Sequence, residues 1–377
     1  MTTTINNEHK KLNVPNLRFP EFSGEWEKHT LQDVVTFSNG KAHENCVNED
    51  GDYILVNSKF VSTNGQVQKR VTSQLSPLHK SQFVMVMSDL PNGKALAKCF
   101  YVEEDNKYTL NQRVCSFTSN NGNVSRFLMY QINRNKYYLR FDDGINQTNL
   151  KKSEVLSCPV FIPIVREQEK IATLLCKIDE RITTQSKIID KLQSLIKGIR
   201  NDVFGKLRKD IGLNAKVGDV LSYEQPQPYI VEDTEYTAGG TPVLTANKAF
   251  VLGYTSETDG IYDKGDCIIF DDFTLDCKYV DFPFKVKSSA IKILTAKNKE
   301  LLRYTFEFLK YLDLSTDEHK RHYIAETQNQ EFILPTTQIV RTIAHAFSTL
   351  SSRMQTIVKQ RDMLELQKQY LLRQMFI

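Results

Sequence analysis

The sequence predicts an α/β protein with two tandem globular domains, each followed by a long α-helix. Three observations support this fold class: a motif that occurs twice, apolar residues at helical spacing after each copy, and short strand-like segments before each copy. The copies lie at residues 161–172 and 332–344, and Pro163 aligns with Pro335 at an offset of 172 residues. Solenoid repeats have periods of about 20–50 residues. The much longer period of this chain indicates a duplicated unit that consists of a domain and a helix.

Composition and charge narrow the class of protein. The chain has 377 residues, of which 40% are hydrophobic and 25% charged, which suits two or three globular domains. The formal net charge of +4 permits an acidic partner such as nucleic acid without requiring one. The seven cysteines include no C-x-x-C pair, so we expect reduced thiols in a cytoplasmic protein rather than a disulfide framework or a zinc site. The sequence predicts no signal peptide and no membrane span.

The first domain is predicted over residues 17–162, after a polar and flexible tail at residues 1–16. Short apolar runs separated by Asn-Gly turns predict its strands, and a helix is expected within the same domain. The predicted strands are 52–56, 82–87 and 114–117, and the predicted helix is 124–138.

The first long helix is predicted over residues 163–206. Its apolar residues recur at alternating spacings of four and three, which is a heptad seam with one polar member, Gln185. Gly205 follows the seam and is expected to end the helix. The seam consists of Ile171, Leu175, Ile178, Ile182, Gln185, Ile189, Leu192, Ile196, Ile199 and Val203.

The second domain is predicted over residues 207–334 and the second long helix over 335–377. The domain has predicted strands at 242–245, 266–270 and 290–294 and a predicted helix at 301–312. The same offset gives the second seam, which is weaker because Arg361 and Lys368 interrupt it. This seam consists of Ile343, Phe347, Leu350, Met354, Ile357, Arg361, Leu364, Lys368, Leu371 and Met375.

The two domains also resemble each other within short segments, such as residues 31–35 and 217–221. We therefore expect one scaffold that carries two different loop surfaces. Neither long helix can bury its seam alone, so the helices should pack on each other or on a partner protein. In an antiparallel pair with flush ends, Gln185 faces Arg361, and two polar residues in one layer would help to fix the register.

The entry motif identifies a known family. Residues 163–172 fit the pattern P-x-x-x-E-Q-x-K-I-A, and residues 17–27 look like a common start of the same family. Together with the duplication, this resembles the specificity subunit of Type I restriction-modification systems. The second copy departs from the motif, because Ile339 and Val340 stand where Glu167 and Gln168 stand in the first.

The resemblance implies a fold and a function. The two domains would be target recognition domains, each reading half of a bipartite, asymmetric sequence in double-stranded DNA. The long helices would pair as an antiparallel coiled coil that sets the length of the unread spacer. Two modification subunits would methylate adenine, and restriction subunits would translocate and cut DNA in phage defence. Those partners would use S-adenosylmethionine, ATP and Mg²⁺, whereas this chain would bind no cofactor.

The absence of known catalytic motifs agrees with a non-catalytic chain, but two alternative functions stay open. There is no G-x-x-x-x-G-K-[ST] loop for ATP and no [DN]-P-P-[YF] motif for methyl transfer. Asp271, Asp276 and Lys278 resemble the acid and lysine pattern of a Mg²⁺-dependent nuclease, although solvated loop residues give the same pattern. A coiled-coil interaction scaffold that reads no DNA is the other alternative. The segment 319–322 lacks the Glu of H-E-x-x-H and is expected to be a basic loop rather than a metal site.

Candidate DNA-binding residues are loop side chains that can reach base edges or phosphates. In the first domain these are Lys41, Ser58, Lys59, Asn64, Lys69, Arg70, Asn92, Lys94, Lys98, Gln112, Arg113, Asn146, Gln147 and Asn149. In the second domain they are Gln225, Gln227, Tyr229, Asn247, Lys248, Lys278, Tyr279, Arg321, His322, Tyr323 and Gln328. Any one of them has the alternative of being an ordinary exposed polar residue.

Overall fold

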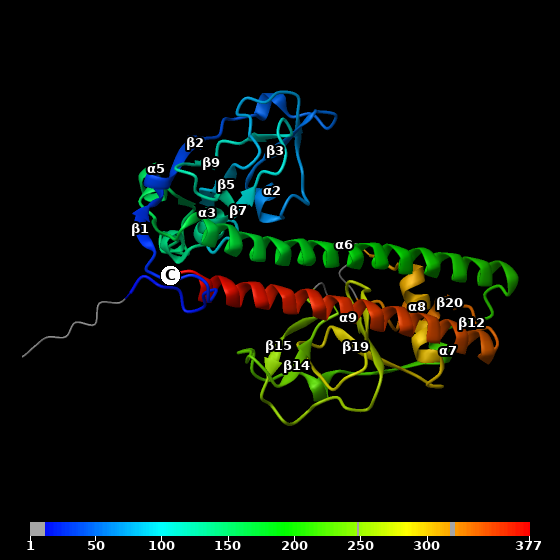
Figure 1. The fold of residues 1–377 in the computed structure, drawn as a ribbon. Helices are drawn as coiled ribbons and strands as arrows, with labels where there is room; N and C mark the ends of the chain where they lie inside the picture. The colour runs from blue at the N-terminus through cyan, green and yellow to red at the C-terminus, as the bar shows by residue number, and fades with distance from the viewer. Residues whose placement is uncertain (1–11, 247–248, 317–320) are drawn as a thin grey trace, which may run out of the picture. The chain divides into compact units, whose positions relative to one another are not determined.

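The computed structural model describes residues 12–246, 249–316 and 321–377. The chain divides into two compact units: residues up to 183 together with 361–377, and residues 184–360. Each unit combines one globular domain with part of each of two long helices, α6 (Val165–Asp210) and α9 (Thr337–Met375), both labelled in Figure 1.

The first domain is built from short strands. These are β1 (Glu27–Thr30), β2 (Val35–Asn39), β3 (Tyr53–Val56), β4 (Arg70–Val71), β5 (Phe83–Val86), β6 (Ser88–Asp89), β7 (Cys99–Tyr101), β8 (Tyr108–Leu110), β9 (Val114–Ser119), β10 (Thr148–Asn149) and β11 (Pro159–Ile162). A four-stranded antiparallel sheet has the order β2-β9-β5-β7, and a three-stranded sheet has the order β4-β3-β8 with β3 parallel to β8. β1 pairs with β11, which directly precedes α6, and β6 pairs with β10.

Short helices connect these strands. They are α1 (Leu31–Val34), the 3-10 helix η1 (Glu44–Cys46), α2 (Ser58–Ser62), α3 (Ser125–Ile132), α4 (Lys136–Leu139) and α5 (Lys152–Leu156). The single helix predicted over 124–138 is wrong, since α3 and α4 are separate. Arg134 between them has a φ of 55°, and the Asn135 side chain caps α4 by accepting a hydrogen bond from the Tyr137 amide.

The second domain repeats this topology. Its elements are β12 (Ala215–Lys216), α7 (Val217–Val220), β13 (Leu221–Glu224), η2 (Gln227–Tyr229), β14 (Thr241–Leu244), β15 (Val251–Thr255), β16 (Cys267–Asp271), β17 (Cys277–Val280), β18 (Lys285–Val286), β19 (Ile291–Ala296), α8 (Leu301–Leu312), η3 (Thr327–Asn329) and β20 (Glu331–Phe332). The four-stranded sheet has the order β13-β19-β16-β17, and β14 runs parallel to β18 as β3 does to β8. β12 pairs with β20 as β1 pairs with β11. The duplication seen in the sequence therefore extends to the fold of the two domains.

Each four-stranded sheet is buried on both faces. In β5, Phe83 and Met85 belong to one apolar cluster, whereas Val84 and Val86 belong to another. In β16, Ile268 and Ile269 divide in the same way between two clusters. Successive side chains of a strand point to opposite faces, so a strand buried on both sides becomes a continuous apolar run. This explains why short apolar runs in the sequence located these strands.

The long helices follow the predicted seams. Every predicted seam residue is buried or half-buried. In the first unit, Ile171 and Leu175 of α6 share an apolar cluster with Leu371 and Met375 of α9. In the second unit, Phe204 of α6 shares one with Val340 and Ile343 of α9. The beginning of each helix thus packs with the end of the other, which is the expected antiparallel arrangement.

Two predicted boundaries are wrong. α6 continues through Gly205 to Asp210, and Gly212, with a φ of +78°, takes the left-handed conformation just beyond the helix end. Residues 12–16 are not a free tail, because the Asn13 carbonyl accepts a hydrogen bond from the Trp26 amide. Residues 1–11 of the predicted tail lie outside the described residues. Within the described ranges, none of the helices combines the length and apolar character that crossing a membrane requires.

Candidate nucleic-acid interface

The start of α6 is fastened to the first domain by two buried polar residues of the entry motif. Glu167 is fully buried and accepts hydrogen bonds from Arg18 Nε at 2.8 Å and from Trp26 Nε1 at 3.3 Å. Gln168 accepts a hydrogen bond from the Val124 amide and donates one to the Pro163 carbonyl. The Glu-Gln pair is therefore a structural joint between helix and domain.

The second unit makes the equivalent joint with apolar atoms. Val340 aligns with Gln168 and is buried in the core of the second domain. The aligned phenylalanines near the helix ends, Phe204 and Phe376, pack on aromatic rings in both units. Phe204 lies 5.3 Å from Tyr304, and Phe376 lies 5.3 Å from Phe127, measured between ring centroids. Each domain is thus held by the beginning of one long helix and the end of the other.

Polar clusters add to these joints. In the second unit, Glu307 of α8 is 1% exposed and forms ion pairs with Arg200 at 2.7 Å and with Arg303 at 2.6 Å. Arg303 also donates to Ser351 of α9. Since Arg200 belongs to α6, this cluster ties the domain to both long helices. Such fixation gives the loop surfaces of each domain a defined orientation on its helix pair.

Most predicted DNA-binding residues lie at the surface, and a few do not. The exposed ones are Lys41, Lys59, Asn64, Lys69, Arg70, Asn92, Lys94, Gln112, Arg113, Asn146, Gln147, Asn149, Gln225, Gln227 and Arg321. The half-buried ones are Ser58, Lys98, Lys278, Tyr279 and Gln328. Asn247 and Lys248 lie outside the described residues. Tyr229, His322 and Tyr323 are buried, and the Tyr229 hydroxyl donates to Glu224, so these three side chains belong to the scaffold.

The fold brings two predicted loops of the first domain together. β6 and β10 place residues 88–94 beside residues 144–149, and Asn92 donates a hydrogen bond to the Gly144 carbonyl. The Asp89 carboxylate accepts hydrogen bonds from the backbone amides of residues 90, 95 and 96, which shapes the loop that carries Asn92 and Lys94. We call the resulting surface the first loop surface; it consists of Asn92, Lys94, Asn146, Gln147 and Asn149.

Other candidates of the first domain are not gathered there. Lys98 donates to the Ser62 carbonyl, and Arg70 donates to the Gly51 carbonyl. Gln112 donates to the Glu44 carboxylate. Each of these three side chains is hydrogen-bonded to another part of the domain, so the fold does not gather them into the first loop surface.

In the second domain, exposed candidates surround a buried lysine that the sequence reading missed. Lys292 of β19 is 1% exposed, and its Nζ lies 2.7 Å from Gln225 Oε1 and 3.6 Å from Asp272 Oδ2. Burial lowers the pKa of Lys292, Asp272 opposes this effect, and Arg321 reinforces it. The sequence signal that could have located this residue is a lysine within an otherwise apolar predicted strand. We call the group around it, Tyr223, Gln225 and Arg321, the second loop surface.

The carboxylates of the alternative nuclease site serve other contacts. Asp271 is buried and accepts hydrogen bonds from the Phe273 and Thr274 amides, both at 2.9 Å. Asp276 pairs with Lys310 at 3.0 Å and with Lys278 at 3.4 Å. Burial would raise the pKa of Asp276, but the hydrogen bond and charge of Lys310 hold it below its ordinary value. Among the described residues, no three His, Cys, Asp or Glu side chains converge in a way that could hold a metal ion.

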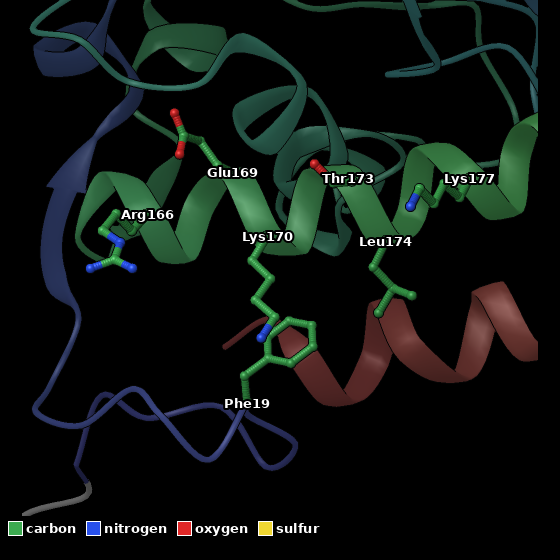
Figure 2. Close-up of a pocket in the computed structure, with 7 residues that line it drawn as sticks. All are labelled: Phe19, Arg166, Glu169, Lys170, Thr173, Leu174 and Lys177. Carbon is green, nitrogen blue, oxygen red and sulfur yellow. The ribbon is translucent and has the colours of Figure 1, made fainter.

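Figure 2 shows a groove along the first turns of α6 in the first unit. Its volume is about 450 Å³, and Phe19 from the N-terminal segment forms one wall. Lys170 Nζ lies 4.4 Å from the centre of the Phe19 ring and also pairs with Glu21. The groove combines apolar walls with basic side chains, a chemistry suited to protein contacts. It is lined by Phe19, Arg166, Glu169, Lys170, Thr173, Leu174 and Lys177.

Known proteins are similar to this chain in sequence or in fold. Residues 23–194 match the family described as Type I restriction modification DNA specificity domain. The chain is 45% identical over 126 residues to the Type I restriction enzyme EcoR124I/EcoR124II specificity subunit of Escherichia coli; the match covers 32% of this chain and 31% of that protein. The chain thus spans about a third of the length of this curated relative.

A solved structure shares the fold over nearly its full length. The crystal structure of the S subunit of a Type I restriction-modification system from M. genitalium superimposes with a TM-score of 0.65 at 16% identity. The match covers 97% of this chain and 99% of that one. The two-domain, two-helix architecture is therefore a known fold.

Proposed function

We propose that this chain is a specificity subunit of the Type I restriction-modification family, and that it reads the DNA target of such a complex without performing catalysis. Each domain reads one half of a bipartite, asymmetric site in double-stranded DNA. One observation carries the proposal: the same sheet topology occurs twice, with different polar side chains at the loop surfaces. Two versions of one scaffold suit a target whose halves differ in sequence.

The recognition domains in this proposal are residues 17–162 and 207–334. The first loop surface and the second loop surface hold the strongest base-reading candidates, because amide and guanidinium groups match the edges of bases. The remaining exposed lysines and arginines are proposed to bind phosphates, which position the protein without reading sequence. The joints at Glu167 and Glu307 support this role, since they fix each domain on its helices.

The helix pair is proposed to set the spacing between the half-sites. Antiparallel packing within each unit supports this role, because an interlocked helix pair resists bending and sliding. Partners are proposed to supply the chemistry in the cytoplasm: two modification subunits that methylate adenine with S-adenosylmethionine, and restriction subunits that use ATP and Mg²⁺. The groove in Figure 2 is a candidate contact for one of them.

Methylome sequencing tests the proposal directly. The chain is expressed with its modification partner in a host that lacks other adenine methylation, and methylated sites are mapped. We expect one new bipartite motif with an unread spacer. A control that omits this chain should give no motif. A continuous motif, or methylation that does not depend on this chain, would contradict the proposal.

Binding to duplex DNA separates this function from a coiled-coil scaffold without DNA reading. The purified complex with the modification subunits should bind a duplex that carries the motif, and affinity should fall steeply with salt because phosphate contacts release counterions. A duplex with scrambled half-sites serves as the control. Equal affinity for both duplexes would favour the scaffold.

A further inference from the structure

Lys292 occupies a position where a charge is costly. Its side chain is 1% exposed, inside the four-stranded sheet of the second domain. Glu224, the last residue of β13, pairs with Ile293, so Gln225 comes next to Lys292 across the sheet. A buried ammonium group is tolerated only when it is paired and hydrogen-bonded, and here Asp272 and Gln225 provide those partners.

The scaffold itself does not require this charge. In the first domain, β2, β9 and β5 take the places of β13, β19 and β16. Cys115 of β9, which pairs with Met85 and with Asn39 at the end of β2, occupies the position of Lys292. A neutral, small side chain therefore suffices in the same sheet. The buried lysine belongs to what distinguishes the two domains, which is the surface above it.

Asp272 connects the lysine to a second segment of that surface. It is 1% exposed, and its Oδ1 accepts hydrogen bonds from the His322 amide at 3.1 Å and the Tyr323 amide at 2.7 Å. These bonds hold the segment that carries the exposed Arg321. The ring of Tyr223, 40% exposed, lies 5.9 Å from Lys292 Nζ. An aromatic ring, an amide and a guanidinium group thus gather around one buried ion pair.

The lysine also decides which way the Gln225 amide points. An ammonium group can only donate hydrogen bonds, so the oxygen of the carboxamide must face Lys292 and its NH₂ group must face outward. The outward group offers donors. It complements base edges that offer acceptors in the major groove, namely N7 of guanine or adenine, guanine O6 and thymine O4.

We propose that Gln225 reads an acceptor-bearing base in the half-site of the second domain, and that Lys292, paired with Asp272, is the positioning residue that orients its amide. This inference rests on the proposed function, because it presumes that the second domain reads DNA. It goes further by naming one reading residue, the support beneath it and the hydrogen-bonding character of the base.

The test compares methylated motifs of the complex that contains wild-type chain or a variant. Gln225→Ala should relax one position of the second half-site, reducing base preference there about tenfold. Gln225→Glu places an acceptor outward and should shift preference at the same position toward cytosine, which offers the N4 donor. The paired variant Lys292→Met with Asp272→Asn should relax that position too, with the first half-site unchanged.

A conservative variant separates positioning from a merely structural role. Lys292→Gln with Asp272→Asn keeps a donor for the Gln225 oxygen and should restore part of the preference. Lys285→Met with Glu257→Gln is the matched control, since Lys285 is also buried and ion-paired in this domain but lies on β18. The control should leave the motif unchanged. Melting temperatures of all variants are measured alongside.

Each outcome bears on the inference. An unchanged motif in Gln225→Ala and Gln225→Glu would overturn base reading by Gln225. Relaxation by Gln225→Ala but not by the Lys292 and Asp272 variants would overturn the positioning role, as would equal relaxation by the Lys285 control. If wild-type chain directs no bipartite motif at all, the proposed function fails first, and this inference fails with it. That result is distinguishable because it does not depend on the variants.

Discussion

Lys368 of α9 forms an ion pair with Asp179 of α6, with 2.5 Å between Nζ and Oδ1, at a position where the heptad pattern calls for an apolar residue. The other oxygen of Asp179 accepts a hydrogen bond from the Tyr130 hydroxyl at 2.7 Å. The apparent flaw in the second seam is therefore a contact that joins both long helices and α3 of the first domain. All three residues lie within the first unit, and the helices α3, α6 and α9 that carry them are labelled in Figure 1.

Tyr130→Phe should cost about 1 kcal/mol of unfolding free energy, since it removes one hydrogen bond from a half-buried carboxylate. Lys368→Leu should change stability by less than about 0.5 kcal/mol, because both partners are partly exposed and leucine suits the seam. Urea denaturation measures both. The control is Tyr137→Phe on the neighbouring helix α4. A larger loss for Lys368→Leu than for Tyr130→Phe would contradict this ranking.

Glu167→Ala should destabilise the first unit by about 3 kcal/mol, because it leaves the Arg18 guanidinium without its buried partner. Trp26, which donates to Glu167, is the only tryptophan of the chain, so its fluorescence reports unfolding of this unit. Glu169→Ala, two residues on and exposed, is the matched control and should be near neutral. Similar fluorescence midpoints for the two variants would argue against a structural joint at Glu167.

The contribution of Asp276 to the stability of the second unit should disappear at acidic pH. The pKa of Asp276 is lower in the folded protein than its ordinary value, so its stabilising effect is present above about pH 4 and disappears as pH falls through the folded pKa. Asp276→Asn should therefore be less stable than wild type at pH 7 and equal to it near pH 2. Circular dichroism in urea at both pH values measures the difference. An unchanged difference at low pH would count against the Lys310 contact.

Replacing both Gln185 and Arg361 by Leu should raise the melting temperature by a few degrees. Both are half-buried seam positions, and polar residues in a coiled-coil seam reduce stability. Gln185 belongs to the second unit and Arg361 to the first, so their pairing remains a prediction from the sequence. Calorimetry of the two single variants and the double variant tests it. A melting temperature that falls by several degrees in the double variant would reject the predicted layer.

Inserting one heptad into each long helix should lengthen the tolerated spacer by about three base pairs. Seven helical residues add roughly 10.5 Å, and base pairs are about 3.4 Å apart. Insertion after residues 183 and 360 keeps both seams in phase. Methylome sequencing reads the spacer, and an insertion in only one helix serves as the control. An unchanged spacer in the double insertion would refute the helix pair as the element that sets spacing.

The sequence was most informative where the physics is local. Heptad spacing located both seams, because side chains three and four apart lie on one helix face. The prediction that Gly205 ends the first long helix was wrong. A glycine inside a helix destabilises it by only about 1 kcal/mol, and the neighbouring Phe204 packs in an aromatic cluster. Local stop signals yield to packing of that kind.

Apart from the pairing of the two seams, contacts between residues far apart in the chain could not be predicted from the sequence. Lys292 has its hydrogen-bond partner 67 positions away at Gln225, so neither residue marks the other along the chain. Tyr229, His322 and Tyr323 were predicted to face DNA because of their residue types, yet each is buried. A single sequence does not say which polar aromatic side chains the fold turns inward.

The first domain cannot complete its core from its own residues. Met375 and Phe376 pack against Trp26 and Phe127, which precede them by more than 200 positions. During synthesis on a ribosome, the domain made first therefore waits for the last stretch of α9, with its apolar surface uncovered meanwhile. The second domain already has α6 when its own strands emerge. Order of synthesis and order of completion are thus reversed in this chain, because the domain made first is the last to complete its core.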